Sequence, residues 1–350
     1  MLYLTGMEYS IWAWAGFATF ILIMLALDLG LLNRKAHAVT YKEAATWSAV
    51  WVSLALVFAA GVFWKLGSLT GKEFLAGYLI ELSLSVDNLF VFLLIFSYFK
   101  VPAKYQHRVL FWGVLGALVM RITMIGLGAA LIDRFHWIIY VFGFFLIYTG
   151  IKMMRQEETD VNPEQNPIVR FVTRFIPISH HYEGEKFFTV VNGRRTGTLL
   201  LLVLVIVEVT DLVFAVDSIP AIFGITTNTF IVYTSNVFAI LGLRSLYFLL
   251  AGVVEKFHYL KMGLAVVLTF VGVKMLGESF VKPYMDKEMV IGISLGVVAF
   301  VLISSVVASL IWPKEAETHI EVELPPGFDS PFDDDEGKLG GDERQTENRA

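Results

Sequence analysis

Residues 74–99 read FLAGYLIELSLSVDNLFVFLLIFSYF, an apolar run interrupted by two acids, Glu81 and Asp87. A helix needs roughly 20 apolar residues to cross a bilayer, so this run is long enough to span one. Residues 211–218 repeat the pattern as DLVFAVDS inside a second apolar run, with an acid at both matching positions. An acid at the centre of a span costs ~2.5–3.5 kcal/mol on insertion scales, so it needs a partner or a function. The two motifs therefore predict both the fold class and the position of a site.

The rest of the chain has the composition of a membrane protein. Of 350 residues, 56% are hydrophobic and 17% are charged, against ~45–50% and ~25% in soluble domains. Helices are the economical interpretation, because lone strands would leave backbone groups unpaired in lipid. We predict an all-α polytopic membrane bundle of about nine transmembrane helices. The expected spans are residues 10–32, 45–66, 74–99, 109–132, 137–154, 198–223, 230–254, 260–277 and 289–312.

The two acidic motifs belong to a longer internal repeat. Residues 116–121 (GALVMR) and 239–244 (AILGLR) place an arginine on the span after each motif, and two more matches follow in the same order. The offset is 130 residues at the acids, 123 at the arginine and 122 at the last two matches. Each unit holds three spans, an odd number, so the second unit must enter from the opposite side. We predict inverted repeats over 73–154 and 198–279, as in many secondary transporters, whose substrate sites lie near the midplane.

Basic residues predict the orientation of the bundle. Fifteen Lys and Arg residues lie in the loops and span ends of one side, and five lie on the other. Loops rich in Lys and Arg stay in the cytoplasm. We therefore expect the N-terminus outside the cell and the C-terminus in the cytoplasm.

Two segments are predicted to lie outside the membrane, which leaves residues 1–313 as the transmembrane domain. The loop 155–197 is cytoplasmic on this topology, and its run FFTVV at 187–191, followed by Asn-Gly, is a hairpin signal. A partly ordered linker is the alternative for this loop. Residues 314–350 hold twelve acids and four bases, a composition typical of a disordered, solvated tail.

Acids outnumber bases inside the predicted spans, with five deep acids and two deep arginines. Carboxylate, amide and hydroxyl oxygens suit hard cations such as Mg²⁺, Ca²⁺ and Mn²⁺. The chain has no cysteine, which excludes disulfides, thiolate metal sites and thiol redox catalysis. The candidate metal ligands are Asp87, Asp217, Glu81, Asp211, Asn88, Ser218 and Glu208, and the expected structural charge partners are Arg121 and Arg244.

The spacing within each motif limits how its acids can act together. Residues six positions apart are ~9 Å and ~240° apart on a regular helix, so both acids can hold one ion only where the helix is broken. Pro220 cannot donate to the carbonyl of Val216, which predicts a break beside Asp217 in the sixth span. The third span has no proline. Glu208 shares a face with the first acid of its motif, but its repeat position is Tyr78.

The motifs resemble those of the TerC family of integral membrane proteins, in its Alx-like branch. The matching residues are 77–81 (GYLIE), 85–91 (SVDNLFV), 214–222 (FAVDSIPAI) and 238–244 (FAILGLR), and the likeness covers about residues 10–312. The resemblance implies a bacterial inner-membrane protein with a LysE-like transporter relationship. It also implies manganese as an exported substrate, with links to tellurite resistance and the alkaline response. Nothing carries over to the acidic tail.

Two functions from different classes follow from these observations. The first is export of divalent metal ions, above all manganese, through a midplane carboxylate site between the repeats. The alternative is a non-transporting scaffold or regulatory subunit of a stress-response complex, which would use the basic loop and the acidic tail. No nucleophile–base arrangement or nucleotide loop is present in the sequence, so we expect no enzyme. The expected partners are the lipid bilayer and a divalent cation, with a homo-oligomer or stress-complex partners left open. We expect no nucleic acid and no permanently bound cofactor.

Overall fold

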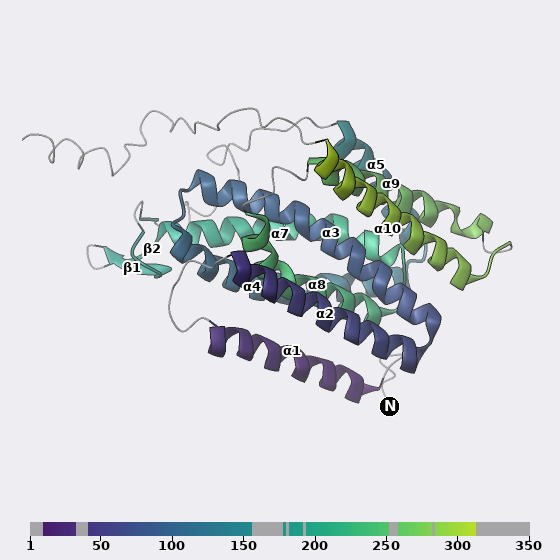
Figure 1. The fold of residues 1–350 in the computed structure, drawn as a ribbon, viewed down its shortest axis with the longest axis horizontal. Helices are drawn as coiled ribbons and strands as arrows, with labels where there is room; N and C mark the ends of the chain where they lie inside the picture. The colour runs from purple at the N-terminus through teal and green to yellow at the C-terminus, as the bar shows by residue number, and fades with distance from the viewer. Residues whose placement is uncertain are drawn as a thin grey trace, which may run out of the picture. The chain divides into compact units, whose positions relative to one another are not determined.

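The computed structural model describes residues 10–32, 41–155, 178–179, 182–191, 194–251, 258–281 and 284–312. All described residues belong to one compact unit within Met1–Lys314. The predicted acidic tail and most of the loop 155–197 lie outside the described residues. Figure 1 labels the elements α1 (Ile11–Leu32), α2 (Tyr41–Leu66), α3 (Ser68–Tyr98), α4 (Ala103–Arg134), α5 (Ile138–Arg155), β1 (Phe188–Val191), β2 (Arg194–Gly197), α7 (Leu199–Phe223), α8 (Thr229–Leu250), α9 (His258–Val281) and α10 (Lys287–Ile311).

Every predicted span coincides with one of these helices. Eight of them, α2 to α5 and α7 to α10, are long and apolar enough to cross a membrane. In α1, whose side chains are described as far as Ala26, the apolar helix covers Ile11–Ala26. The prediction of an all-α polytopic membrane bundle is confirmed.

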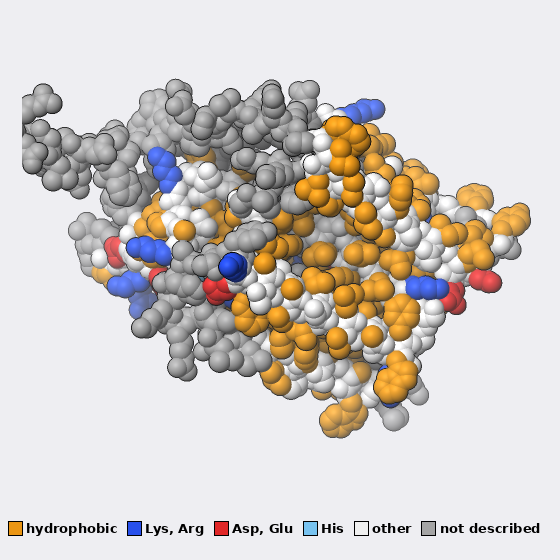
Figure 2. All heavy atoms as spheres, viewed as in Figure 1, with side chains coloured by type: hydrophobic (Ala, Val, Ile, Leu, Met, Phe, Trp, Pro, Cys, Tyr) orange, Lys and Arg blue, Asp and Glu red, His pale blue; other side chains and the backbone are white. Residues whose placement is uncertain are grey.

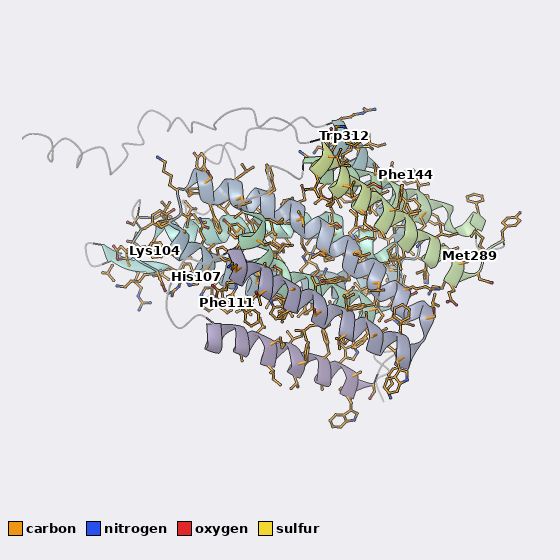
Figure 3. All side chains as sticks on the ribbon, in the orientation of Figure 1. Lys104, His107, Phe111, Phe144, Met289 and Trp312 are labelled. Atoms are coloured by element: carbon orange, nitrogen blue, oxygen red, sulfur yellow. The ribbon has the colours of Figure 1, made fainter. Side chains whose placement is uncertain are left out.

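The outside of the bundle is apolar. On the face that Figure 2 shows, hydrophobic side chains cover the middle of the helices, and most charged side chains lie toward the helix ends. Phe144, Met289 and Trp312 point outward and are more than half exposed (Figure 3). Soluble proteins rarely expose contiguous apolar surface on this scale. These side chains are therefore placed to face lipid.

The two motif helices, α3 and α7, each bury one face in the bundle. Both contact each other, and each packs against a helix of the other repeat, α3 against α8 and α7 against α4. On its other sides α3 is covered by α2 and α10. Apolar residues such as Ile80 and Leu89 of α3 and Phe238 of α8 are fully buried at these contacts. This packing turns the motif acids toward neighbouring helices, while Leu212, Val213 and Val216 of α7 are exposed on the outside of the bundle.

Helices α5 and α9 cross at two very close contacts. A Cβ added to Gly143 would lie 3.1 Å from the carbonyl oxygen of Gly272, and one added to Gly150 would lie 2.7 Å from that of Ala265. Small residues allow such approach of two membrane helices. The order of the contacts makes the helices antiparallel, and an offset of 122 residues exchanges one contact with the other. This pairing is consistent with two repeats of opposite orientation, and their inversion across a membrane stays a prediction.

The described part of the loop 155–197 forms a hairpin, as one of the two interpretations of its sequence predicted. Strands β1 and β2 pair antiparallel, with Val191 opposite Arg194. The segment before them contacts the end of the bundle where α3 leads into α4. There the Tyr182 hydroxyl donates to the carbonyl oxygen of Phe99 at 2.6 Å, and burial raises the pKa of this hydroxyl, which keeps it a donor. The hairpin is thereby tied to the end of the membrane domain.

The break predicted at Pro220 is wrong. Helix α7 runs without interruption from Leu199 to Phe223 and includes Pro220. The proline lies in the last turn, so it removes one hydrogen bond close to the point where the helix ends in any case. The Pro220 carbonyl oxygen itself accepts from the backbone N–H of Gly224 at 2.9 Å. The two acids of each motif are therefore held on unbroken helices.

Candidate ion site between the repeats

The buried faces of α3 and α7 form an antiparallel seam that carries polar residues. Its members recur every third or fourth position, which keeps them on one face of each helix. At one end Gly77 lies against Ile222, and at the other Phe92 and Val207 line one small cavity together with Asp211. The seam consists of Gly77, Glu81, Ser85, Asn88 and Phe92 on α3 and of Val207, Asp211, Ala215, Ser218 and Ile222 on α7.

The guanidinium group of Arg121, on α4, lies in this seam. Its Nη1 donates to the Glu81 carboxylate and, at 3.0 Å, to Ser218 Oγ. Its Nε and Nη2 point at the two carboxylate oxygens of Asp211, each at 3.4 Å. Arg121 is 1% exposed, Glu81 0% and Asp211 4%. One buried arginine thus joins an acid of the first repeat to an acid of the second.

Glu208 adds a third acid to this cluster. It lies on α7 one turn before Asp211, with which its carboxylate interacts electrostatically. The carboxylate fills the space over Gly116 of α4, where any Cβ would collide with it. With all groups ionised, Glu81, Asp211, Glu208 and Arg121 carry a formal charge of −2. A glycine on α4 is thus what admits the carboxylate into the bundle.

Several buried polar atoms next to the cluster lack a hydrogen bond. Within the part of the chain that the structure describes, these atoms are Glu81 Oε2, Ser85 Oγ, the Asn88 amide nitrogen and both amide atoms of Asn236. Asn236, on α8, lies beside Glu81. A buried polar group without a partner costs ~1–3 kcal/mol, so native proteins seldom keep several together without use. Three of these atoms are oxygens on buried side chains, of the kind that bind hard cations.

Asp87 and Asp217 form a second pair on a different face of the motif helices. Both are partly buried, and their carboxylates interact with each other electrostatically. The Thr149 hydroxyl of α5 donates to Asp217 Oδ1 at 3.3 Å. The ammonium groups of Lys152 and Lys261 act on Asp217 and Asp87, respectively. The pair therefore faces α5 and α9, away from Arg121.

The structure brings the sequence-predicted ligands together only in part. Glu81, Asp211 and Ser218 contact one guanidinium, and Asn88 shares their seam. Asp87 and Asp217 lie apart from them because α3 and α7 are continuous helices. Among the described residues, no three His, Asp or Glu side chains converge on a point that could hold a metal ion.

Arg244 is the last of the predicted site residues, and Asn236 and Ser85 are two polar residues that the sequence analysis did not include. Arg244 is partly buried on α8, and its role as a charge partner stays a prediction. Sequence reasoning did not assign Asn236 or Ser85 to the site. An amide inside an apolar span was the available signal for Asn236, and the spacing of four from Glu81 was the signal for Ser85.

A membrane-spanning helical bundle with a buried charge cluster between two repeated halves defines a polytopic integral membrane protein. The chain belongs to the TerC family: a family model described as "Integral membrane protein TerC family" matches residues 66–317. No solved structure matches the chain.

The relatives found are bacterial and match over nearly their whole length. The chain is 58% identical to an uncharacterized membrane protein of Myxococcus xanthus over 87% of this chain and 94% of that protein. It is 51% identical to Alx of Escherichia coli strain K12, described as a candidate membrane-bound redox modulator, over 83% of this chain and 91% of Alx. An uncharacterized membrane protein of Rickettsia bellii is 39% identical over 77% of this chain and 89% of that protein.

Proposed function

We propose that the protein exports divalent metal ions, manganese above all, across the inner membrane of a bacterium. The observation that carries the proposal is the surplus of acids in the cluster, where Glu81 and Asp211 share a single arginine and the partly buried Glu208 lies beside Asp211. Charge inside a membrane is expensive, so a surplus of two negative charges favours a bound cation or protons. Oxygen donors without thiolates or paired imidazoles favour a hard divalent cation. The choice of manganese within that class rests on the resemblance to TerC-family exporters.

The repeat architecture supports transport by alternating access. Glu81 and Asp211 occupy equivalent positions of the two repeats, as do Asp87 and Asp217. Each pair draws one carboxylate from each half, so a movement of one half against the other changes the distance within both pairs. In this proposal the carboxylates replace part of the hydration shell of the ion, and the pair Asp87 and Asp217 is a second station on its path.

The basic residues at one end of the bundle support the proposed topology, in which this end faces the cytoplasm and export starts from it. Lys104, Arg108 and Arg195 lie where the hairpin meets the membrane domain. Basic segments of this kind remain on the cytoplasmic side of bacterial membrane proteins. The C-terminus is cytoplasmic on the same argument, and the N-terminus lies outside.

Flux measurements on the purified full-length protein in proteoliposomes test the proposal. Wild-type protein is compared across Mn²⁺, Mg²⁺, Ca²⁺, Zn²⁺ and Fe²⁺, and we expect Mn²⁺ to move fastest. Asp87→Asn and Asp217→Asn should each abolish the flux and leave the amount of folded protein unchanged, because each keeps side-chain size and removes a charge. Asp133→Asn, at an exposed position near the end of α4, is the matched control and should transport normally. Absence of flux with all five ions would refute the proposal.

The same measurement separates transport from the alternative function. The name of the Escherichia coli relative refers to redox modulation, and a scaffold in a stress-response complex would be a non-transporting form of such a role. This chain has no cysteine, so it cannot act through thiol chemistry. A protein that supports growth under metal or redox stress but moves no ion in proteoliposomes would fit the scaffold.

A further inference from the structure

We infer that Arg121 is a tethered cation that alternates with the transported ion, and that Glu208 receives its guanidinium group when the ion binds. The inference rests on the proposed function and adds to it the exchange by which the site is filled and emptied. The sequence placed Glu208 among the candidate metal ligands and Arg121 among the structural charge partners, and the inference gives both residues a different role.

The guanidinium of Arg121 occupies the place that a bound divalent ion would need. It lies between Glu81 and Asp211 and contacts Ser218 as well. The guanidinium and a divalent cation cannot occupy this position together, because like charges a few ångströms apart inside a protein repel by several kcal/mol. An ion that binds to both carboxylates must therefore displace the guanidinium.

The contacts of Arg121 leave part of the site unused. Both contacts with Asp211 are 3.4 Å long, beyond the usual 2.7–2.9 Å of a charge-assisted hydrogen bond. Glu81 Oε2 and both amide atoms of Asn236 make no hydrogen bond of standard geometry within the described ranges, although the Asn236 amide is close enough to interact with the Glu81 carboxylate. A permanent structural ion pair would be expected to satisfy its buried partners. The unused oxygens are instead available to a cation that binds more ligands than a guanidinium does.

Glu208 lies where a displaced guanidinium would go. Its carboxylate lies over Gly116, which precedes Arg121 on α4 by about 7.5 Å along the helix and about 140° around it. On α7, Glu208 is one turn from Asp211, the carboxylate that Arg121 already contacts at 3.4 Å. In this proposal the guanidinium leaves Glu81 and passes along α7 from Asp211 to Glu208. The equivalent position of the first repeat is Tyr78, and the arginine that corresponds to it by the repeat symmetry is Arg244, not Arg121.

The charges balance only when all four groups take part. A divalent ion with Glu81 and Asp211 is neutral, and the pair of Arg121 with Glu208 is neutral. In the ion-free state the two carboxylates share the guanidinium with one negative charge left over, and Glu208 adds the second negative charge. Binding therefore moves the guanidinium to Glu208 and adds two positive charges, which makes the whole group neutral.

A double-mutant cycle tests the exchange. Isothermal titration calorimetry measures the Mn²⁺ affinity of each purified full-length variant in detergent. Glu208→Gln should weaken Mn²⁺ binding at least about tenfold. In an Arg121→Gln background the same change should have little effect, because no guanidinium remains to be received. Glu185→Gln, on the segment outside the membrane domain, is the matched control and should bind as wild type does.

The outcomes separate the possible roles of Glu208. Equal weakening by Glu208→Gln in both backgrounds would make Glu208 a direct ligand and overturn the inference, and no weakening in either would overturn it as well. The Arg121 variants, with Arg121→Met as the second neutral change, are purified with Mn²⁺ present, since the ion should replace the lost charge. If neither can be obtained folded under that condition, the ion does not substitute for the guanidinium and the inference is wrong. If wild-type protein neither binds nor transports Mn²⁺, the proposed function itself has failed.

Discussion

Replacing Arg121 by alanine should destabilise the metal-free protein severely. The change removes a guanidinium that is 1% exposed and leaves Glu81 and Asp211, at 0% and 4% exposure, without their counter-charge. Breaking a buried ion pair by removing one partner costs about 3–5 kcal/mol. Here two carboxylates lose the same partner, so we expect a loss at the upper end of that range. Ser218 also loses its contact at 3.0 Å.

Thermal unfolding of detergent-purified protein in the presence of a chelator measures this effect. The matched control is Arg108→Ala, which breaks an ion pair with Glu185 at 2.8 Å whose side chains are 36% and 35% exposed. Such exposed pairs are worth ~0–1 kcal/mol. Adding Glu81→Gln to Arg121→Ala should recover part of the stability, because one of the stranded charges disappears. Equal melting temperatures for Arg121→Ala and Arg108→Ala would refute the reasoning and would show that the acids are uncharged or hydrated without the arginine.

Three further predictions concern the crossing of α5 and α9, the continuity of α7 and the membrane topology. Gly272→Ala places a Cβ 2.6 Å from a backbone carbonyl oxygen of α5 and should cost ~1–3 kcal/mol, while Gly292→Ala, which meets nothing within 4 Å, should leave the melting temperature unchanged. Pro220→Ala should retain folded protein and transport, because α7 is already continuous; folded protein without transport would mean that the helix opens there during the cycle. A cysteine placed at Lys186, in a chain that has none, should react with impermeant reagents only from the cytoplasmic side; reaction from outside alone would reverse the topology.

The helices were predictable because membrane insertion depends on local composition. Runs such as residues 74–99 are long and apolar whatever their neighbours are, and lipid permits little besides a helix. The hairpin followed in the same way from Asn192-Gly193 after a β-rich run. The break expected at Pro220 was wrong because a proline disrupts a helix less when it is close to the helix end, and Pro220 lies in the last turn of α7.

The arrangement of the acids depends on which helices surround them. The sequence shows that Asp87 and Glu81 are six positions apart, but only the packing of α4 decides that Glu81 finds a guanidinium while Asp87 faces α5 and α9. Glu208 could not be placed for the same reason, since its position depends on a missing side chain at Gly116 of another helix. Asn236 joins the site through the contact of α8 with α3, a contact between segments far apart in the chain.

The crossing of α5 and α9 bears on how such a chain arises. Gly143 with Gly272, and Gly150 with Ala265, are the contacts expected where a three-helix segment packs against an oppositely oriented copy of itself. A chain that arose by duplication and fusion of such a segment would have an interface between its halves from the start. A substitution at one of these contacts would then affect both halves at once. Glu208 departs from the repeat, because Tyr78 occupies the equivalent position, and it packs against Gly116 of the other half.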